Sequence, residues 1–240
     1  MILQIDAGNT RVNWRVQTGS GRSDVSGVFD YLGLPDWPRG AIERVELASV
    51  AAKDRHEWLL QRIRENFDVP VQEAATAARQ NGLVNSYAQP DAMGVDRWLA
   101  MLGAHGRWGG GFAVVDAGTA ITVDYVDVNG VHLGGYILPG SRLVLQSLNQ
   151  ETGRVRAAEE LGLQSTPGHT TAECVHNGLA WSLAALMQRV ADDCRNFSLS
   201  YVVMTGGDGE RLHSLFPGEA VYAPHLVLDG MDLYWGREPT

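Results

Sequence analysis

The residues best suited to chemistry form two short stretches of nearly the same sequence, Asp6–Thr10 and Asp116–Ala120. Each combines an aspartate, a glycine two residues later and a threonine. Backbone N–H groups beside a glycine and a threonine hydroxyl suit phosphate oxygens, and a carboxylate suits a hydrated Mg²⁺. One such stretch is typical of an ordinary hairpin turn. Two copies in equivalent places favour a duplicated domain whose halves hold one nucleotide between them.

The strands that must position these turns are read from the hydrophobic pattern. An apolar run precedes each turn, at Ile2–Ile5 and at Phe112–Val115, and an alternating run follows each, at Val12–Val16 and at Ile121–Tyr125. Continuous apolar residues are typical of a buried strand, and alternation is typical of a half-buried one. Both turns are therefore expected to join two strands.

Two further motifs carry candidate binding residues. Thr205–Gly207 follows a predicted strand, and its glycines would let an adenine or ribose lie against the backbone, although a plain turn is an equally good interpretation. Gly94–Arg97 places a carboxylate and a guanidinium at the start of a predicted helix, where anions are favoured. Arg97 is suited to a substrate carboxylate and Asp96 to accepting a hydroxyl proton. Alone, this pair also fits a local ion pair.

Composition narrows the class of protein. The chain has 240 residues, of which 45% are hydrophobic and 20% charged, as in ordinary globular proteins. Its net charge of -9 argues against general nucleic-acid binding. We expect no signal peptide and no membrane span. Cys174 and Cys194 are expected to be free thiols, and the protein to be cytoplasmic.

An α/β fold with two related domains follows from the order of the predicted strands and helices. The glycines at 109–111 predict a boundary that gives domains 1–110 and 111–240. Asn129-Gly130 predicts a hairpin. Two capping boxes, Asp54 with Glu57 and Thr170 with Glu173, each predict the start of a helix. Asp91 is a further candidate cap, for the helix that contains Val95. The last predicted helix is Leu226–Trp235.

Taken together, five ordered motifs resemble the type III pantothenate kinases, a family that includes the Bvg accessory factors. They are Asp6–Thr10, Gly94–Arg97, Asp116–Ala120, Gly134–Gly140 and Thr205–Gly207. The resemblance implies two ribonuclease-H-like domains of the actin-like ATPase superfamily with a central nucleotide cleft. It also implies ATP-dependent phosphorylation of pantothenate to 4′-phosphopantothenate, the first step of coenzyme A biosynthesis, by a homodimer.

The resemblance further implies a role for each matching residue. Asp96 would be the catalytic base, Asp6 would hold Mg²⁺ through water, and Asp116 would bind a monovalent cation, K⁺ or NH4⁺. The ATP-binding residues would be Asp6, Ala7, Gly8, Asn9, Thr10, Arg11, Val12, Asn13, Thr119, Gly206 and Gly207. Pantothenate would meet Tyr87, Gly94, Val95, Asp96, Arg97 and, from the neighbouring subunit, Thr171. Ser141 departs from the family pattern, in which an apolar residue is usual.

Two other functions remain open at this level. A sugar kinase of the same superfamily would share the phosphate turns, but a sugar site needs several polar side chains around a ring, and a single acid–arginine pair better suits a carboxylated acceptor. A nucleotide-binding regulator without catalysis would keep the turns without needing Asp96. A screen of acceptors separates these functions.

Overall fold

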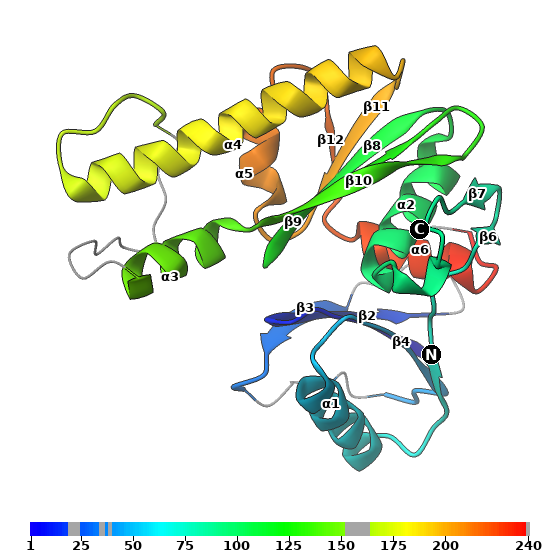
Figure 1. The fold of residues 1–240 in the computed structure, drawn as a ribbon. Coiled ribbons are helices and arrows are strands. Elements are labelled where there is room, and N and C mark those ends of the chain that lie inside the picture. The colour runs from blue at the N-terminus through cyan, green and yellow to red at the C-terminus, as the bar shows by residue number, and fades with distance from the viewer. Residues whose placement is uncertain (19–24, 34–36, 38–39, 152–163, 239–240) are drawn as a thin grey trace. The chain divides into compact units, whose positions relative to one another are not determined.

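The computed structural model describes residues 1–18, 25–33, 37, 40–151 and 164–238. The chain divides into two compact units, Met1–Trp108 with His225–Thr240, and Gly109–Pro224 (Figure 1). The glycines at 109–111 therefore mark one crossing between the units. The second crossing, at Pro224, differs from the single boundary drawn from the sequence, because the C-terminal segment packs with the first unit.

The first unit is built on a five-stranded sheet in the order β3-β2-β1-β4-β5. Its strands are β1 (Ile2–Ala7), β2 (Arg11–Gln17), β3 (Ser26–Asp30), β4 (Arg44–Ser49) and β5 (Val71–Glu73). The β1–β2 and β2–β3 pairs are antiparallel, and β4 runs parallel to β1. Apolar side chains of β1 and β4, such as Ile5 and Leu47, are fully buried with Leu59 and Ile63 of α1 (Lys53–Asn66). This core places the β1–β2 turn at one end of the sheet.

Polar side chains of the same strands meet helix α6 (Leu226–Tyr234). Arg15 donates to Asp229 over 2.6 Å and to Asp232 over 2.7 Å, and Gln4 donates to Asp232 over 2.9 Å. All four side chains are buried. Buried charges need partners, so this network holds α6 to the first sheet and explains why the C-terminal segment belongs to the first unit.

Helix α2 (Val95–Trp108) packs on α6 with backbones in close approach. A Cβ on Gly230 would lie 1.9 Å from the carbonyl oxygen of Leu99, and one on Gly103 would lie 2.6 Å from that of Leu226. Only glycine permits this separation. The helix that begins with Val95, Asp96 and Arg97 is therefore fixed by the end of the chain.

Short elements connect α1 to α2. They are β6 (Arg79–Gln80), β7 (Leu83–Val84) and the 3-10 helix η1 (Pro90–Ala92). Asp91 lies inside η1 and α2 begins at Val95, so the prediction that Asp91 caps this helix is wrong. The Asp54–Glu57 box is wrong as well, since α1 begins at Lys53 after Ala52.

The second unit repeats the sheet order of the first, as β10-β9-β8-β11-β12. Its strands are β8 (Phe112–Ala117), β9 (Ala120–Val126), β10 (His132–Pro139), β11 (Tyr201–Thr205) and β12 (Val221–Tyr222). The three antiparallel strands and the parallel pair recur in equivalent places. This repetition confirms the two related α/β units expected from the sequence.

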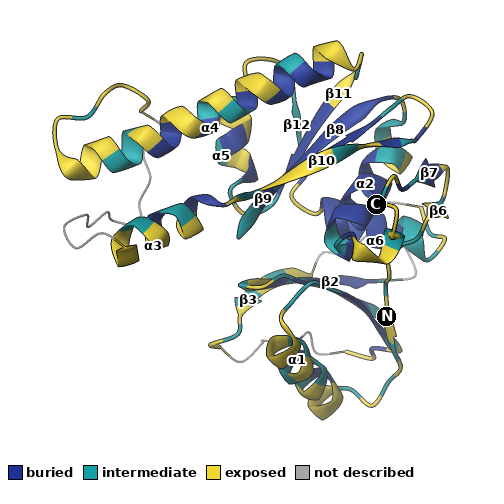
Figure 2. Cartoon of the chain, in the orientation of Figure 1, coloured by how far each residue is buried: buried dark blue, intermediate teal, exposed yellow. Residues whose placement is uncertain are grey.

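Helices α3 (Ser141–Glu151), α4 (Thr171–Asn196) and α5 (Gly209–Leu215) belong to the second unit. The Thr170–Glu173 capping box is confirmed at the start of α4, and the Asn129-Gly130 turn is confirmed with Gly130 at φ 78°. Figure 2 shows exposed residues along the first half of α4 and buried ones farther on. In the parts of the chain given above, no helix has the length and apolarity to cross a membrane.

Candidate active site

The first phosphate turn is the β1–β2 hairpin. Asp6 pairs with Asn13 across the two strands, and the Asn13 amide donates to the Asp6 carboxylate over 3.2 Å. The Gly8 N–H donates to the carbonyl of Arg11 over 3.0 Å, which closes the turn. The structure thus brings together the first group of residues predicted from the sequence.

Asn9 fastens this turn to the segment between β4 and α1. Its side-chain amide donates to the Val50 carbonyl and accepts from the Ala52 N–H, both over 3.0 Å. The Val50 N–H in turn donates to the Ala7 carbonyl over 3.0 Å. Ala52 is the residue that precedes α1, so the side chain of Asn9 accepts the backbone N–H at the N-cap position of this helix.

Val50 also lies against the start of α2. A Cβ on Gly94 would lie 3.5 Å from Val50 Cγ1 and 2.5 Å from Asp96 Oδ1. A side chain at this position would therefore have to displace the Asp96 carboxylate. The same oxygen accepts from the Arg97 N–H over 2.8 Å, which fixes the orientation of the Asp96 carboxylate. One segment, around Val50, thus borders both the phosphate turn and the predicted base.

Asp6 and Asp96 interact electrostatically within the first unit. Burial of the Asp6 carboxyl and, to a lesser extent, the negative charge of Asp96 raise its pKa to about 7, and the Asn13 hydrogen bond lowers it only in part. Two carboxylates that disfavour each other's charge are suited to a bound cation. A hydrated Mg²⁺ fits this position, because it takes carboxylate and water oxygens.

Arg97 and Tyr87, which were predicted to bind the acceptor, lie together in the first unit. The Arg97 side chain is buried, donates from Nη1 to the Tyr87 hydroxyl over 2.9 Å, and lies over the Tyr87 ring at 5.7 Å from its centroid. The Tyr87 N–H donates to the Asn85 side chain over 2.9 Å, which orders this part of the loop. A buried guanidinium with a fixed orientation is suited to a carboxylate.

The second phosphate turn joins β8 to β9. Gly118 N–H donates to the Ala120 carbonyl over 2.9 Å, and Gly140 N–H donates to the Thr119 carbonyl over 3.0 Å. A Cβ on Gly140 would lie 2.4 Å from the Gly118 carbonyl oxygen. The Pro139-Gly140 end of β10 therefore supports this turn directly.

Asp116 and Gly206 lie side by side in the second unit. Strands β8 and β11 pair Asp116 with Thr205, and a Cβ on Gly206 would lie 2.4 Å from Asp116 Oδ1. Gly206 has φ 86°, a conformation that favours glycine. The structure thus joins the predicted cation ligand to the predicted adenosine turn, which also contains Gly207.

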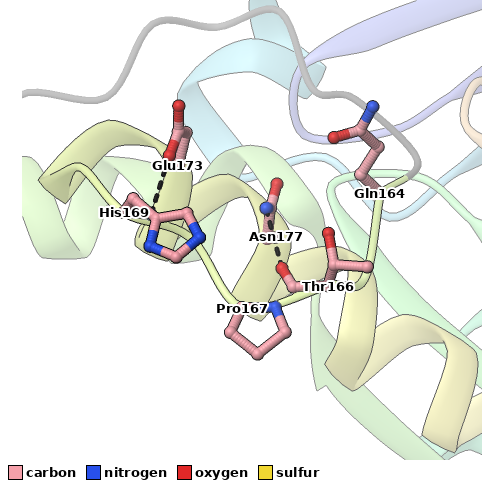
Figure 3. A pocket seen from close by; sticks show the side chains of 6 residues that line it. All are labelled: Gln164, Thr166, Pro167, His169, Glu173 and Asn177. Carbon is pink, nitrogen blue, oxygen red and sulfur yellow. Dashed lines mark hydrogen bonds between the residues drawn. The ribbon is translucent and has the colours of Figure 1, made fainter.

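Thr171 lies on a separate part of the second unit. It is exposed in the first turn of α4, beside a hollow of about 500 Å³. Figure 3 shows the six residues around this hollow, with Asn177 donating to the Thr166 carbonyl over 2.8 Å and Glu173 accepting from the His169 N–H over 2.7 Å. None of the six is a lysine or arginine, and none was predicted as a site residue.

Two residues that contact the first turn were not predicted from the sequence. The Tyr31 hydroxyl donates to the Gly8 carbonyl over 2.8 Å, and the Arg55 guanidinium donates to the Asn9 carbonyl. They lie 24 positions apart on different elements and share no motif with the turn. Only the fold brings them to it.

Comparison with known proteins gives a consistent family. The family model described as type III pantothenate kinase matches residues 2–193. A protein of Marinobacter nauticus named type III pantothenate kinase is 41% identical over 236 residues, which are 97% of each chain.

Among solved structures, a Baf family transcriptional activator of Campylobacter jejuni has a TM-score of 0.61 at 22% identity and covers 97% of this chain and 96% of its own. A Sinorhizobium meliloti protein described as a 2-dehydro-3-deoxygalactonokinase has a TM-score of 0.59 at 12% identity, with 98% of each chain covered. The last two support the fold alone, which is that of the actin-like ATPases and sugar kinases.

Proposed function

Because the chain belongs to the type III pantothenate kinase family, we propose specific roles for its site residues in the phosphorylation of pantothenate by ATP. The product is 4′-phosphopantothenate, and the reaction is the first step of coenzyme A biosynthesis. Phosphoryl transfer depends mainly on positioning and on neutralising charge. The observation that carries the assignment is the fixed orientation of the Asp96 carboxylate, which accepts from the Arg97 N–H in the same unit as Asp6 and adds to the rise of the Asp6 pKa.

Asp96 is the general base. The Arg97 N–H holds its carboxylate in one orientation, and Asp96 takes the proton from the primary hydroxyl of pantothenate as the phosphoryl group is transferred. Arg97 binds the pantothenate carboxylate, with Tyr87 holding the guanidinium from one side. Gly94 and Val95 contribute the backbone at the start of α2.

Asp6 holds Mg²⁺ through water, and the surrounding hairpin binds the phosphates. Mg²⁺, when bound, neutralises charge on the phosphate oxygens. The hairpin residues are Ala7, Gly8, Asn9, Thr10, Arg11, Val12 and Asn13. The closed turn and the Asn9 contacts support this role, because they give the backbone a fixed shape.

In the second unit, Thr119 binds phosphate, Gly206 and Gly207 receive the adenosine, and Asp116 binds a monovalent cation, K⁺ or NH4⁺. The contact of Asp116 with the Gly206 turn supports this grouping. Replacing K⁺ with Na⁺ in the assay, at constant ionic strength, tests the cation. A rate that stays the same would remove it from the proposal.

The protein acts as a cytoplasmic homodimer in which Thr171 reaches the pantothenate of the neighbouring subunit. Support comes from the exposed start of α4 and from three exposed apolar side chains in the second unit, Tyr136, Ile137 and Trp181. Sedimentation equilibrium tests the homodimer. A monomer at assay concentration would contradict it.

A product assay tests the function. The protein is incubated with MgATP, K⁺ and pantothenate, and phosphopantothenate is measured by mass spectrometry. Asp96→Asn should be at least about a hundredfold slower, the usual cost of losing a general base. Asp91→Asn, an exposed neighbour outside the site, should keep the wild-type rate. A near-normal rate in Asp96→Asn would refute its role, and no product from the wild type would refute the acceptor.

A further inference from the structure

Two side chains outside the motifs bind the carbonyl groups of the first phosphate turn. The Tyr31 hydroxyl donates to the Gly8 carbonyl over 2.8 Å, and Arg55, from the first turn of α1, donates to the Asn9 carbonyl. The Arg55 guanidinium lies 5.5 Å from the centroid of the Tyr31 ring. Because the two donors lie together, the two carbonyls point toward the same place.

Peptide geometry converts this observation into a statement about the N–H groups. In a trans peptide the C=O and the following N–H point in opposite directions in one plane. The Gly8 carbonyl therefore sets the direction of the Asn9 N–H, and the Asn9 carbonyl sets that of the Thr10 N–H. Both N–H groups are directed away from Tyr31 and Arg55. Successive N–H groups with a common direction are suited to an anion.

We propose that Tyr31 and Arg55 are positioning residues for the nucleotide, which orient the Asn9 and Thr10 peptides for the phosphates of ATP. This inference rests on the proposed role of the turn in binding phosphate. Neither side chain takes part in proton transfer.

The surroundings of Tyr31 keep its hydroxyl protonated, so that it can donate to the Gly8 carbonyl. Burial and, to a lesser extent, the charge of Asp6 raise the pKa of Tyr31 to about 12, although Arg55 lowers it in part. The hydroxyl therefore keeps its proton at neutral pH. Arg55 is always charged, and it adds positive charge beside a turn that must receive a polyphosphate.

The arrangement separates nucleotide binding from acceptor binding. Tyr31 and Arg55 contact the hairpin, whereas the predicted pantothenate residues in the first unit lie on the loop around Tyr87 and on α2. Loss of the Tyr31 or Arg55 side chain should therefore change the affinity for MgATP and leave the affinity for pantothenate unchanged. General damage to the fold would change both.

The test compares Tyr31→Phe, Arg55→Ala and Arg55→Lys with the wild type. Binding of a non-hydrolysable MgATP analogue is measured by calorimetry, and KM for each substrate by product formation. We expect Tyr31→Phe and Arg55→Ala each to weaken analogue binding by roughly 3–10-fold, the size of one hydrogen bond. Arg55→Lys should regain most of the loss, and KM for pantothenate should stay within about twofold. The double variant should lose less than the product of the single losses, because both residues hold one turn.

Arg64→Ala is the matched control, since Arg64 is an exposed arginine in the last turn of the same helix. Analogue binding in Tyr31→Phe and Arg55→Ala equal to that in Arg64→Ala would overturn the proposal. So would an equal loss of affinity for both substrates. Failure of the wild type to phosphorylate pantothenate would instead refute the proposed function, because analogue binding does not require the acceptor.

Discussion

The negative charge of Asp96 acts on the carboxyl group of Asp6, although the two residues lie 90 positions apart in the sequence. Asp6 lies at the end of β1 and Asp96 in the first turn of α2. Because Asp96 adds to the effect of burial, Asp6 has a pKa of about 7. The residue proposed to hold Mg²⁺ and the residue proposed as base are thereby coupled through their charges.

Asp6→Asn should stabilise the protein without Mg²⁺ or nucleotide, and more so at high pH. The folded-state pKa of Asp6 is raised to about 7 from 3.8, so folded Asp6 keeps a proton that unfolded Asp6 has lost between these values. Wild-type stability therefore falls as pH rises from about 4 to about 7. The gain from the variant should be larger at pH 8 than at pH 5, and at most about 4 kcal/mol. Thermal unfolding at both pH values measures it.

The control for Asp6→Asn is Asp91→Asn, an exposed aspartate in the same unit. It should give no comparable change with pH. Equal melting temperatures of Asp6→Asn and wild type at pH 8 would show that burial and Asp96 do not destabilise the charged form of Asp6.

Tyr87→Phe should weaken pantothenate binding. The change removes the hydroxyl that accepts from Arg97 Nη1 over 2.9 Å and keeps the ring beneath the guanidinium. KM for pantothenate should rise roughly 3–10-fold, with KM for ATP unchanged. Tyr201→Phe, at a tyrosine 40% exposed in the second unit, is the control. An unchanged KM for pantothenate in Tyr87→Phe would contradict the role of this hydroxyl.

Gly206→Ala should damage the turn beside Asp116. Its φ of 86° disfavours a side chain, and its new Cβ would lie 2.4 Å from Asp116 Oδ1. We expect a loss of roughly 2–4 kcal/mol in the free energy of unfolding, together with weaker MgATP binding. Gly236→Ala has φ 74° without a close contact in the described part of the chain, so it should cost only about 1 kcal/mol. Chemical denaturation compares the two, and equal losses would mean that the contact with Asp116 has no effect.

Gly230→Ala should disrupt the α2–α6 contact. The added Cβ would lie 1.9 Å from the Leu99 carbonyl oxygen, so the helices must separate. A loss of about 3 kcal/mol or more is expected, with lower activity because α2 begins with Asp96 and Arg97. Gly178→Ala, at an exposed helical position of α4, should instead gain about 0.5–1 kcal/mol. Calorimetric unfolding distinguishes these outcomes, and a neutral Gly230→Ala would contradict the packing.

Patterns within a few residues were enough to predict the strands, the hairpin turn and one helix start, because neighbouring residues determine these features. The strands around Asp6 and Asp116 follow from apolar runs, and Asn129-Gly130 and the Thr170–Glu173 box act within a few residues. The sequence repeat also predicted two related α/β units, which the repeated sheet order confirms.

Predictions failed where the bounds of an element or a distant residue decide the outcome. Asp54 does not cap α1, because the helix begins before it, at Lys53. Tyr31 and Arg55 could not be predicted at the site, because carbonyl groups of a turn have no sequence signature. The return of α6 to the first unit depends on Arg15 meeting Asp229 and Asp232 more than 200 positions later, which no local pattern encodes.

That return has a consequence for the order of synthesis. During translation, β1, β4 and α2 leave the ribosome before the second unit, but α2 lacks its packing partner until His225–Tyr234 has followed. Until then, Arg15 faces no acid from α6, and the helix that presents Asp96 and Arg97 has one apolar side uncovered. A nascent chain interrupted anywhere within the second unit therefore has strands β1 and β2 of the first sheet but no support for α2 from α6. The residues proposed to bind the acceptor gain that support only once α6 has been made.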